Sequence, residues 1–147
     1  MERSAISRAP ILPDRVRSIG GQSFAFLPHR FLREGFLCSL SPDEQRLYLF
    51  LVMAADRNGL SFYHYDRICA ILEMVIDDYV DARDGLLAKD LIAFDGTRFQ
   101  VLSLPSKPIH RAWRALRTPS ELEDHDPATI HRTILASLAE QGNPTKR

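Results

Sequence analysis

Residues 75–104, VIDDYVDARDGLLAKDLIAFDGTRFQVLSL, constrain the fold more than any other stretch of the chain. The first half has apolar residues at helical spacing, which predicts a helix over about 76–89. Two short runs rich in apolar and β-branched residues follow, LIAF and RFQVLSL, with Asp95-Gly96 between them. Because Asp-Gly is favoured in two-residue hairpin turns, the sequence predicts a helix that leads directly into a β-hairpin.

The residues before this stretch predict a first helix with a well-defined start. Ser41 and Glu44 have the spacing of a capping box, and Pro42 lies at the first helical position. We expect this helix to end at Asn58-Gly59, where glycine can take a left-handed conformation.

A short strand and a second helix should follow this first helix. Leu60, Ser61 and Phe62 are enough for a short strand only. The second helix is predicted over 65–72, with Ile68, Ile71 and Leu72 buried.

This order of elements resembles that of winged helix-turn-helix domains, and it is similar to those of plasmid and phage replication proteins and of MarR-like regulators. The likeness covers about 40–104 and is carried by LSPDEQRLYLFLVMAADRNG, YDRICAIL and ARDGLLAKDLIAFDGTRFQVLSL. The resemblance implies a mainly α fold with a small β-hairpin. It also implies that residues 75–89 enter the major groove of DNA and that the hairpin turn, 94–99, contacts phosphates or the minor groove.

The whole chain is expected to comprise a winged helix-turn-helix domain with an N-terminal arm and a C-terminal helical extension. The predicted segments are a flexible basic arm at 1–23, the domain at 24–104 with its core at 40–104, a basic amphipathic segment at 105–118, a linker at 119–126 and a helix at 127–141. Proline and glycine mark the arm, and Asp126 followed by Pro127 is a helix start signal.

Composition narrows the classes of function. Lys/Arg and Asp/Glu number nineteen each, so net charge favours neither nucleic acid nor membrane. Cys38 and Cys69 have no metal-binding or redox spacing and are predicted to be free core residues. No apolar run is long enough to span a bilayer and the start is not a signal peptide, so we expect a cytoplasmic protein without membrane contact. We find no catalytic, cofactor or metal-binding motif, which predicts a protein that is not an enzyme.

The predicted groove-reading helix carries the wrong charge for that role. Asp77, Asp81 and Asp84 follow one another at i, i+4 and i+7, whereas such helices usually present Arg, Lys, Asn, Gln or Ser to DNA. This acidic side can be a solvated surface, a surface that binds another protein, or a surface that contacts the major groove directly. It can also pair with the protein's own arginines.

Basic and polar candidates for DNA contact lie elsewhere in the chain. They are Thr97 and Arg98 at the hairpin turn, Arg15 and Arg17 in the arm, and Lys107, Arg111, Arg114 and Arg117 after the hairpin. The alternative candidates for protein interaction are Asp77, Asp81, Asp84, Ile130, Ile134 and Leu138. Arg83 lies on the apolar side of its helix, and we expect its head group to pair with a carboxylate such as Asp66 or Asp90.

Two hypotheses of function follow from these residues. In the first, the chain is a non-enzymatic protein associated with double-stranded DNA, a regulator or a replication or mobile-element accessory, held by its basic flanks and hairpin turn. In the second, it has the winged fold but binds protein instead of DNA. The apolar side of the 127–141 helix makes a homodimer compatible with either hypothesis.

Overall fold

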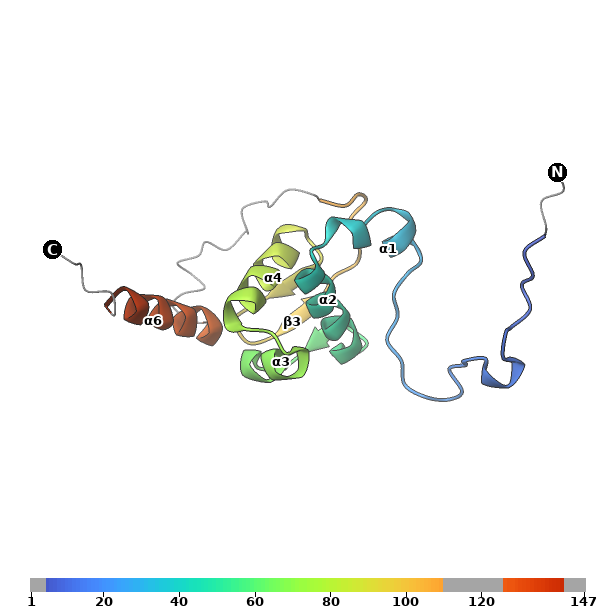
Figure 1. The fold of residues 1–147 in the computed structure, drawn as a ribbon, viewed down its shortest axis with the longest axis horizontal. Coiled ribbons are helices and arrows are strands. Elements are labelled where there is room, and N and C mark those ends of the chain that lie inside the picture. The colour runs from blue at the N-terminus through green and yellow to red at the C-terminus, as the bar shows by residue number, and fades with distance from the viewer. Residues whose placement is uncertain (1–4, 110–125, 142–147) are drawn as a thin grey trace.

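The computed structural model describes residues 5–109 and 126–141, which form mainly helices with one small antiparallel sheet (Figure 1). In chain order the elements are η1 (Pro13–Arg15), α1 (Arg30–Arg33), η2 (Leu37–Ser39), α2 (Pro42–Ala54), β1 (Leu60–Ser61), α3 (Tyr65–Leu72), α4 (Ile76–Ala88), β2 (Ile92–Phe94), β3 (Phe99–Val101) and α6 (Pro127–Gln141). This arrangement is compatible with a winged helix: α2, α3 and α4 correspond to the three predicted helices, and β2 and β3 to the hairpin.

Helix α2 begins as predicted and ends earlier than predicted. The Glu44 backbone N–H donates to Ser41 Oγ over 3.2 Å, and the Ser41 N–H donates to Glu44 Oε1 over 2.8 Å, which completes the capping box. The helix ends at Ala54 because the Asp56 carboxylate accepts the backbone N–H groups of Asn58 and Leu60. This side-chain turn stops the helix four residues before the expected end at Asn58-Gly59.

Three strands make the sheet, in the order β1-β3-β2. Leu60 of β1 pairs with Gln100 of β3, and the predicted hairpin is confirmed by the antiparallel pairing of β2 with β3. Pairing ends at Phe94 and Phe99, so residues 95–98 make the connection, which is longer than the two-residue turn expected at Asp95-Gly96.

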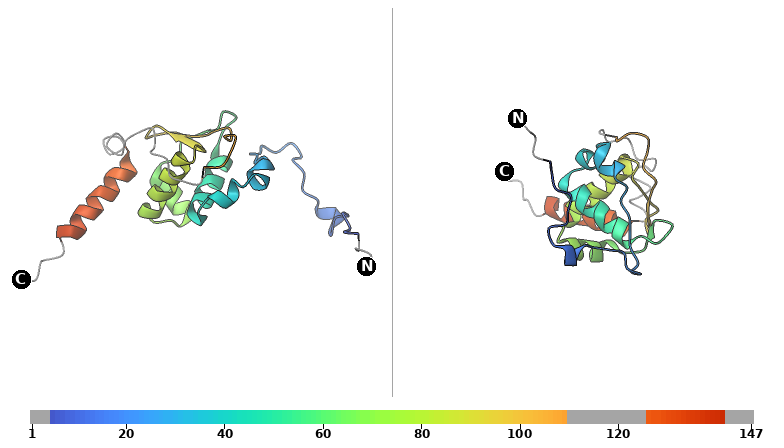
Figure 2. Two further views of the ribbon diagram at one scale, coloured as in Figure 1. Left: turned by 90° about the horizontal axis from the view of Figure 1, so that it is seen from above. Right: turned by 90° about the vertical axis from the view of Figure 1, so that its right-hand side faces the viewer.

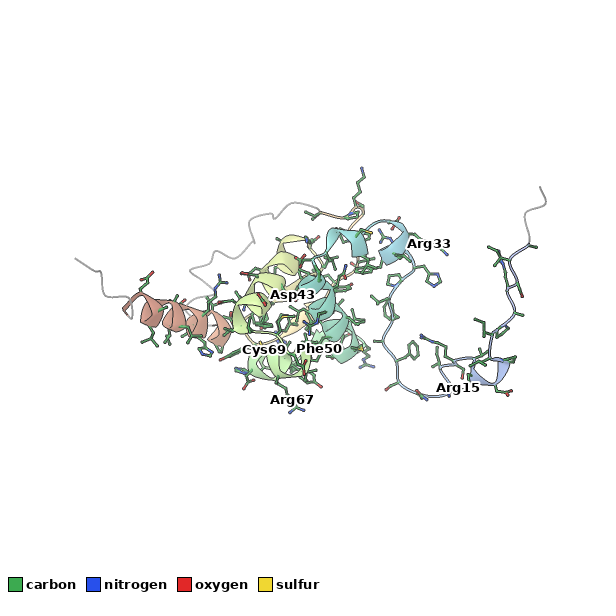
Figure 3. All side chains as sticks on the ribbon, in the orientation of Figure 1. Arg15, Arg33, Asp43, Phe50, Arg67 and Cys69 are labelled. Carbon is green, nitrogen blue, oxygen red and sulfur yellow. The ribbon has the colours of Figure 1, made fainter. Side chains whose placement is uncertain are left out.

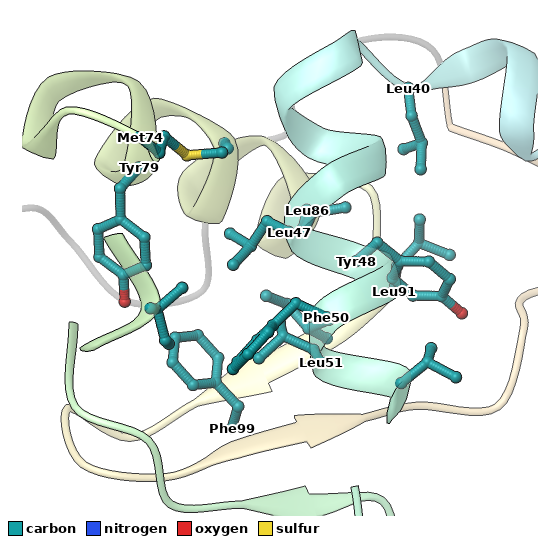
Figure 4. Close-up of a cluster of buried hydrophobic side chains, with 14 of the residues drawn as sticks. Leu40, Leu47, Tyr48, Phe50, Leu51, Met74, Tyr79, Leu86, Leu91 and Phe99 are labelled. Carbon is teal, nitrogen blue, oxygen red and sulfur yellow. The ribbon is translucent and has the colours of Figure 1, made fainter. Parts of the chain in front are cut away.

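The core lies between the three helices and the sheet. Leu47 and Leu51 of α2, Leu86 of α4 and Phe99 of β3 point into it (Figure 4). The prediction for α3 is confirmed at Ile68, which is fully buried. It is wrong for Ile71, which is about half exposed because α3 is only eight residues long and turns a single side toward the core.

Helices α2 and α4 approach closely where Gly85 faces Glu44. A Cβ atom at position 85 would overlap the Glu44 carboxylate, and Lys89 Nζ binds both this carboxylate and the Ser39 carbonyl oxygen. Glycine therefore makes room for a buried ion pair at the crossing of the two helices.

Residues 5–29 are exposed throughout. They extend away from the helices as an open arm, with Arg15 far from the core (Figures 2 and 3). After η1, regular structure resumes only at α1. The arm exposes large apolar side chains, among them Ile11, Phe24 and Phe26.

Candidate interaction surfaces

The acidic side of α4, formed by Asp77, Asp78 and Asp81, turns away from the core and toward α6. All three carboxylates are exposed, while Tyr79 and Val80 between them are buried. The position of the carboxylates therefore follows from helical periodicity, with the apolar residues taken up by the core.

Arg132 of α6 neutralises part of this acidic side. Its Nε lies 3.4 Å from Asp77 Oδ1, and its Nη1 lies 3.2 Å from Asp81 Oδ1. From the sequence, the partner of Asp77 and Asp81 could have been solvent, DNA or another protein. In the structure, both carboxylates pair with a cation of the same chain. Asp84 does not join them, because its carboxylate lies 3.2 Å from Arg83 Nε.

A buried ion pair fixes the start of α6 on α4. Arg83 and Asp126 are 1% and 2% exposed, and Arg83 Nη1 donates to Asp126 Oδ2. Arg83 Nη2 also donates to Thr129 Oγ1 over 3.1 Å. The prediction that Arg83 pairs with a carboxylate is confirmed, but the buried partner is Asp126, 43 positions along the chain, and neither Asp66 nor Asp90.

The surroundings of Arg83 keep it charged. Burial lowers the pKa of Arg83, whereas the negative charges of Asp84 and Asp126 raise it. Together the raising effects are larger than the effect of burial, so the pKa of Arg83 lies above its ordinary value. Its guanidinium carbon lies 5.2 Å from the centre of the Phe94 ring, within range of a cation–π contact. Partial burial raises the pKa of Asp84, although Arg83 opposes that shift.

Asp126 has a second role as the cap of α6. Its carboxylate accepts the backbone N–H of Ala128 over 3.4 Å and of Thr129 over 3.3 Å, as the sequence predicts for this residue. Ala128 is fully buried, and His131 Nδ1 lies 3.1 Å from the Tyr65 hydroxyl of α3. The first turns of α6 are therefore docked on α3 and α4.

The rest of α6 projects away from the helices (Figures 1 and 2). Ile130, Ile134 and Leu138, spaced four residues apart, form what we call the α6 stripe, with Leu135 beside it. Ile134 and Leu138 are 51% and 58% exposed. No described residue covers this stripe beyond the first turns.

The predicted DNA contacts are dispersed. Thr97 and Arg98 are exposed at the β2–β3 turn, where Arg98 Nε lies 3.0 Å from Asp95 Oδ2. The Asp95 carboxylate also accepts the backbone N–H groups of Arg98 and Thr97, and these bonds lower the pKa of Asp95 to about 2. A phosphate at Arg98 would compete with Asp95.

Other basic candidates lie far from this turn or outside the described residues. Arg15 and Arg17 are exposed in the arm, and Lys107 is exposed after β3. Arg111, Arg114 and Arg117 lie outside the described residues.

A second apolar surface was not predicted from the sequence. We call it the α1–α2 groove, an opening of about 510 Å³. Its lining includes Leu27, Leu32, Leu37, Leu40, Tyr48 and Leu49, with His29, Gln45 and Arg46 as polar members. The sequence indicates this surface only through Leu49. Leu49 falls on the same side of α2 as Gln45 and Arg46, where a leucine indicates a second apolar side.

Residues 5–109 and 126–141 contain neither a cluster of metal ligands nor a membrane-spanning helix. Within these ranges no group of three or more His, Cys, Asp or Glu side chains is placed to hold a metal ion. No helix there has the length and hydropathy to span a membrane.

Comparisons with known proteins add no family to this description. No family model, no curated protein and no solved structure matches the chain.

Proposed function

We propose that this chain is a non-enzymatic winged-helix module that binds protein through the α6 stripe. The observation that carries the proposal is that α6 already covers the acidic side of α4. The side of α4 that would enter a major groove carries Asp77 and Asp81, and Arg132 of α6 already pairs with both. DNA at this side would displace α6 and meet the three carboxylates of Asp77, Asp78 and Asp81, which repel phosphates.

The position of α6 supports a protein partner. A short isolated helix is only marginally stable in water, and helices in proteins gain most of their stability by burying an apolar side. Only the first turns of α6 have that support from α3 and α4, and its outer part exposes Ile134 and Leu138. An exposed apolar stripe of this kind is typical of helices that dock on another protein.

Photo-crosslinking in the cells that make the protein tests this proposal. A benzophenone amino acid is placed at Ile134 on the stripe or, as a matched control, at Ala136, which is exposed on the opposite side of the same helix. The proposal expects a covalent protein adduct from position 134 and none from position 136. Equal adducts from both positions, or none from either, would contradict it.

DNA association through the basic flanks is the second candidate function, with a role as regulator or as replication or mobile-element accessory. It is favoured by the exposure of Thr97 and Arg98 at the tip of the β2–β3 turn, together with Arg15 and Arg17 in the arm. In this hypothesis α4 remains covered, and DNA is held without major-groove contact.

Fluorescence anisotropy of mixed-sequence duplex DNA separates the two candidates. The second candidate expects affinity that falls steeply with salt and a slope reduced by about one for Arg98→Ala, as for the loss of one phosphate contact. It also expects the Arg111/Arg114/Arg117→Ala variant to lose most binding. No binding at low salt would leave the protein-binding module alone.

A further inference from the structure

We propose that the end of the molecule formed by α1 and the segment after β3 binds the phosphate backbone of double-stranded DNA. We call this site the α1 basic surface and define it by the side chains of Arg30, Arg33 and Lys107. The inference is independent of the protein partner proposed for the α6 stripe. It assigns the DNA of the second candidate function to a surface other than the β2–β3 turn.

A hydrogen bond joins two parts of the chain at the α1 basic surface. Arg30 Nη2 donates to the Pro105 carbonyl oxygen over 2.9 Å, across 75 positions of sequence. Pro108 lies beside α1 as well, since its Cγ is 3.9 Å from the place where Gly35 would carry a Cβ atom. The segment after β3 therefore runs along residues 30–35 (Figure 1), and it brings Lys107 to the helix that carries Arg33.

The α1 basic surface has a net positive charge. Arg33 and Lys107 are exposed, and none of the ion pairs among residues 5–109 and 126–141 involves either of them. The carboxylate of Glu34 pairs with Arg30 Nε. Three cations and one carboxylate leave two positive charges, and no Asp or Glu follows Lys107 in the sequence before Glu121. The surface therefore attracts polyanions.

Arg30 positions the surface and leaves the other two cations for a ligand. Its guanidinium carbon lies 5.4 Å from the centre of the Phe36 ring, within range of a cation–π contact. Together with the bond to Pro105, this contact holds the guanidinium on its own chain. Arg33 and Lys107 then have the roles of phosphate ligands, the first as a planar fork with several donors and the second as a point charge.

The acidic side of α4 lies far from this surface. Figure 1 and the left view of Figure 2 both place α6 at one end of the molecule and α1 at the other, and Figure 3 shows Arg33 at the α1 end. Asp77 and Asp81 face α6, where Arg132 pairs with both. DNA at the α1 end therefore keeps its phosphates away from these carboxylates. The unequal distribution of charge also orients the α1 end toward DNA during approach.

The β2–β3 turn is the less suitable site for phosphates. Phe94, next to the turn, lies beside Arg83, whose ion pair with Asp126 holds α6, so the turn is near the end that carries the acidic side. Arg98 at the turn is already paired with Asp95 over 3.0 Å. The α1 basic surface instead offers two exposed cations that have no carboxylate within ion-pair distance among the described residues.

Fluorescence anisotropy of a labelled duplex of mixed sequence tests the proposal on the full chain. The Arg33→Ala/Lys107→Ala variant removes two cations from the surface. The Arg57→Ala/Arg67→Ala variant is the matched control, because it removes the same charge from exposed positions on other elements. We expect the first variant to bind at least about tenfold more weakly at low salt. Its slope of log K against log salt concentration should fall by about two, one for each lost phosphate contact, while the control keeps the wild-type slope.

Three outcomes would overturn the α1 basic surface. They are a wild type that does not bind the duplex at low salt, a variant without Arg33 and Lys107 that binds like the wild type, and equal losses in both double variants, which would indicate attraction by net charge alone. The crosslinking test at Ile134 does not depend on any of these outcomes. Failure of the α1 basic surface and failure of the α6 stripe are therefore distinguishable.

Two controls accompany the titration. Circular dichroism checks folding, and a variant that does not fold is replaced by Arg33→Gln/Lys107→Gln. Vesicles of phosphatidylserine test a membrane as the other source of phosphate groups. Binding to vesicles that depends on Arg33 and Lys107, without binding to the duplex, would overturn the assignment to DNA.

Discussion

Replacing Arg83 with methionine should release α6 from the rest of the molecule. The change removes a guanidinium that is 1% exposed and leaves the Asp126 carboxylate, 2% exposed, without its cation. Breaking a buried ion pair on one side costs about 3–5 kcal/mol, because the remaining charge is buried without compensation. What remains to Asp126 is the Thr129 hydroxyl and the long bonds from the backbone N–H groups of Ala128 and Thr129.

The molecule can avoid this cost by lifting α6, which exposes Asp126 to water. Ala128 is the one fully buried apolar residue of the described helix, so little else opposes release. Since about 1.4 kcal/mol is a factor of ten in an equilibrium constant, a cost of 3 kcal/mol shifts docking by more than about 100-fold. The core formed by α2, α4 and β3 should keep its stability.

Hydrogen–deuterium exchange of the backbone amides measures both effects at once. For Arg83→Met we expect amides at 130–134 to lose protection while those at 47–52 keep it. Arg132→Met is the matched control, because it removes exposed ion pairs worth less than about 1 kcal/mol. Adding Asp126→Asn to Arg83→Met should restore part of the docking, since asparagine caps a helix without a buried charge. Unchanged protection in Arg83→Met, or an equal loss in Arg132→Met, would refute the reasoning.

Three further perturbations test local features of the fold. Gly85→Ala should lower the free energy of unfolding in urea by about 1–3 kcal/mol, because the methyl group displaces the Glu44 carboxylate that Lys89 holds. A gain in stability, as expected for alanine at a solvent-exposed helix position, would contradict this. Gly59→Ala should lower it by at least about 1 kcal/mol, since φ is +83° and a β3 carbonyl oxygen blocks the new Cβ; an unchanged urea midpoint would count against both causes. The pKa of Asp95 is depressed, so its stabilisation of the β2–β3 turn is complete above the ordinary carboxyl pKa and is lost as pH falls through about 2. The Thr97 amide resonance should therefore titrate near pH 2 and should not do so in Asp95→Asn.

The local structure of this chain could be predicted because its causes are local. The capping box of Ser41 and Glu44 joins residues three apart, and the start of α6 depends on Asp126 and its immediate neighbours. The hairpin follows from strand residues on both sides of Asp95-Gly96. The predicted end of α2 was wrong because of another local interaction. The Asp56 carboxylate accepts backbone N–H groups and so ends the helix before Gly59.

The interaction surfaces depend on contacts that periodicity does not encode. The sequence by itself determined that α4 has an apolar and an acidic side and that Arg83 lies on the apolar side. Only the tertiary structure decided that Asp126 neutralises Arg83, that Arg132 covers Asp77, and that an apolar groove opens beside α2. The physical reason is that a charge or an apolar side chain is satisfied by any suitable partner within a few ångströms. Which partner comes that close is decided by how the helices pack, across separations of 43 positions or more.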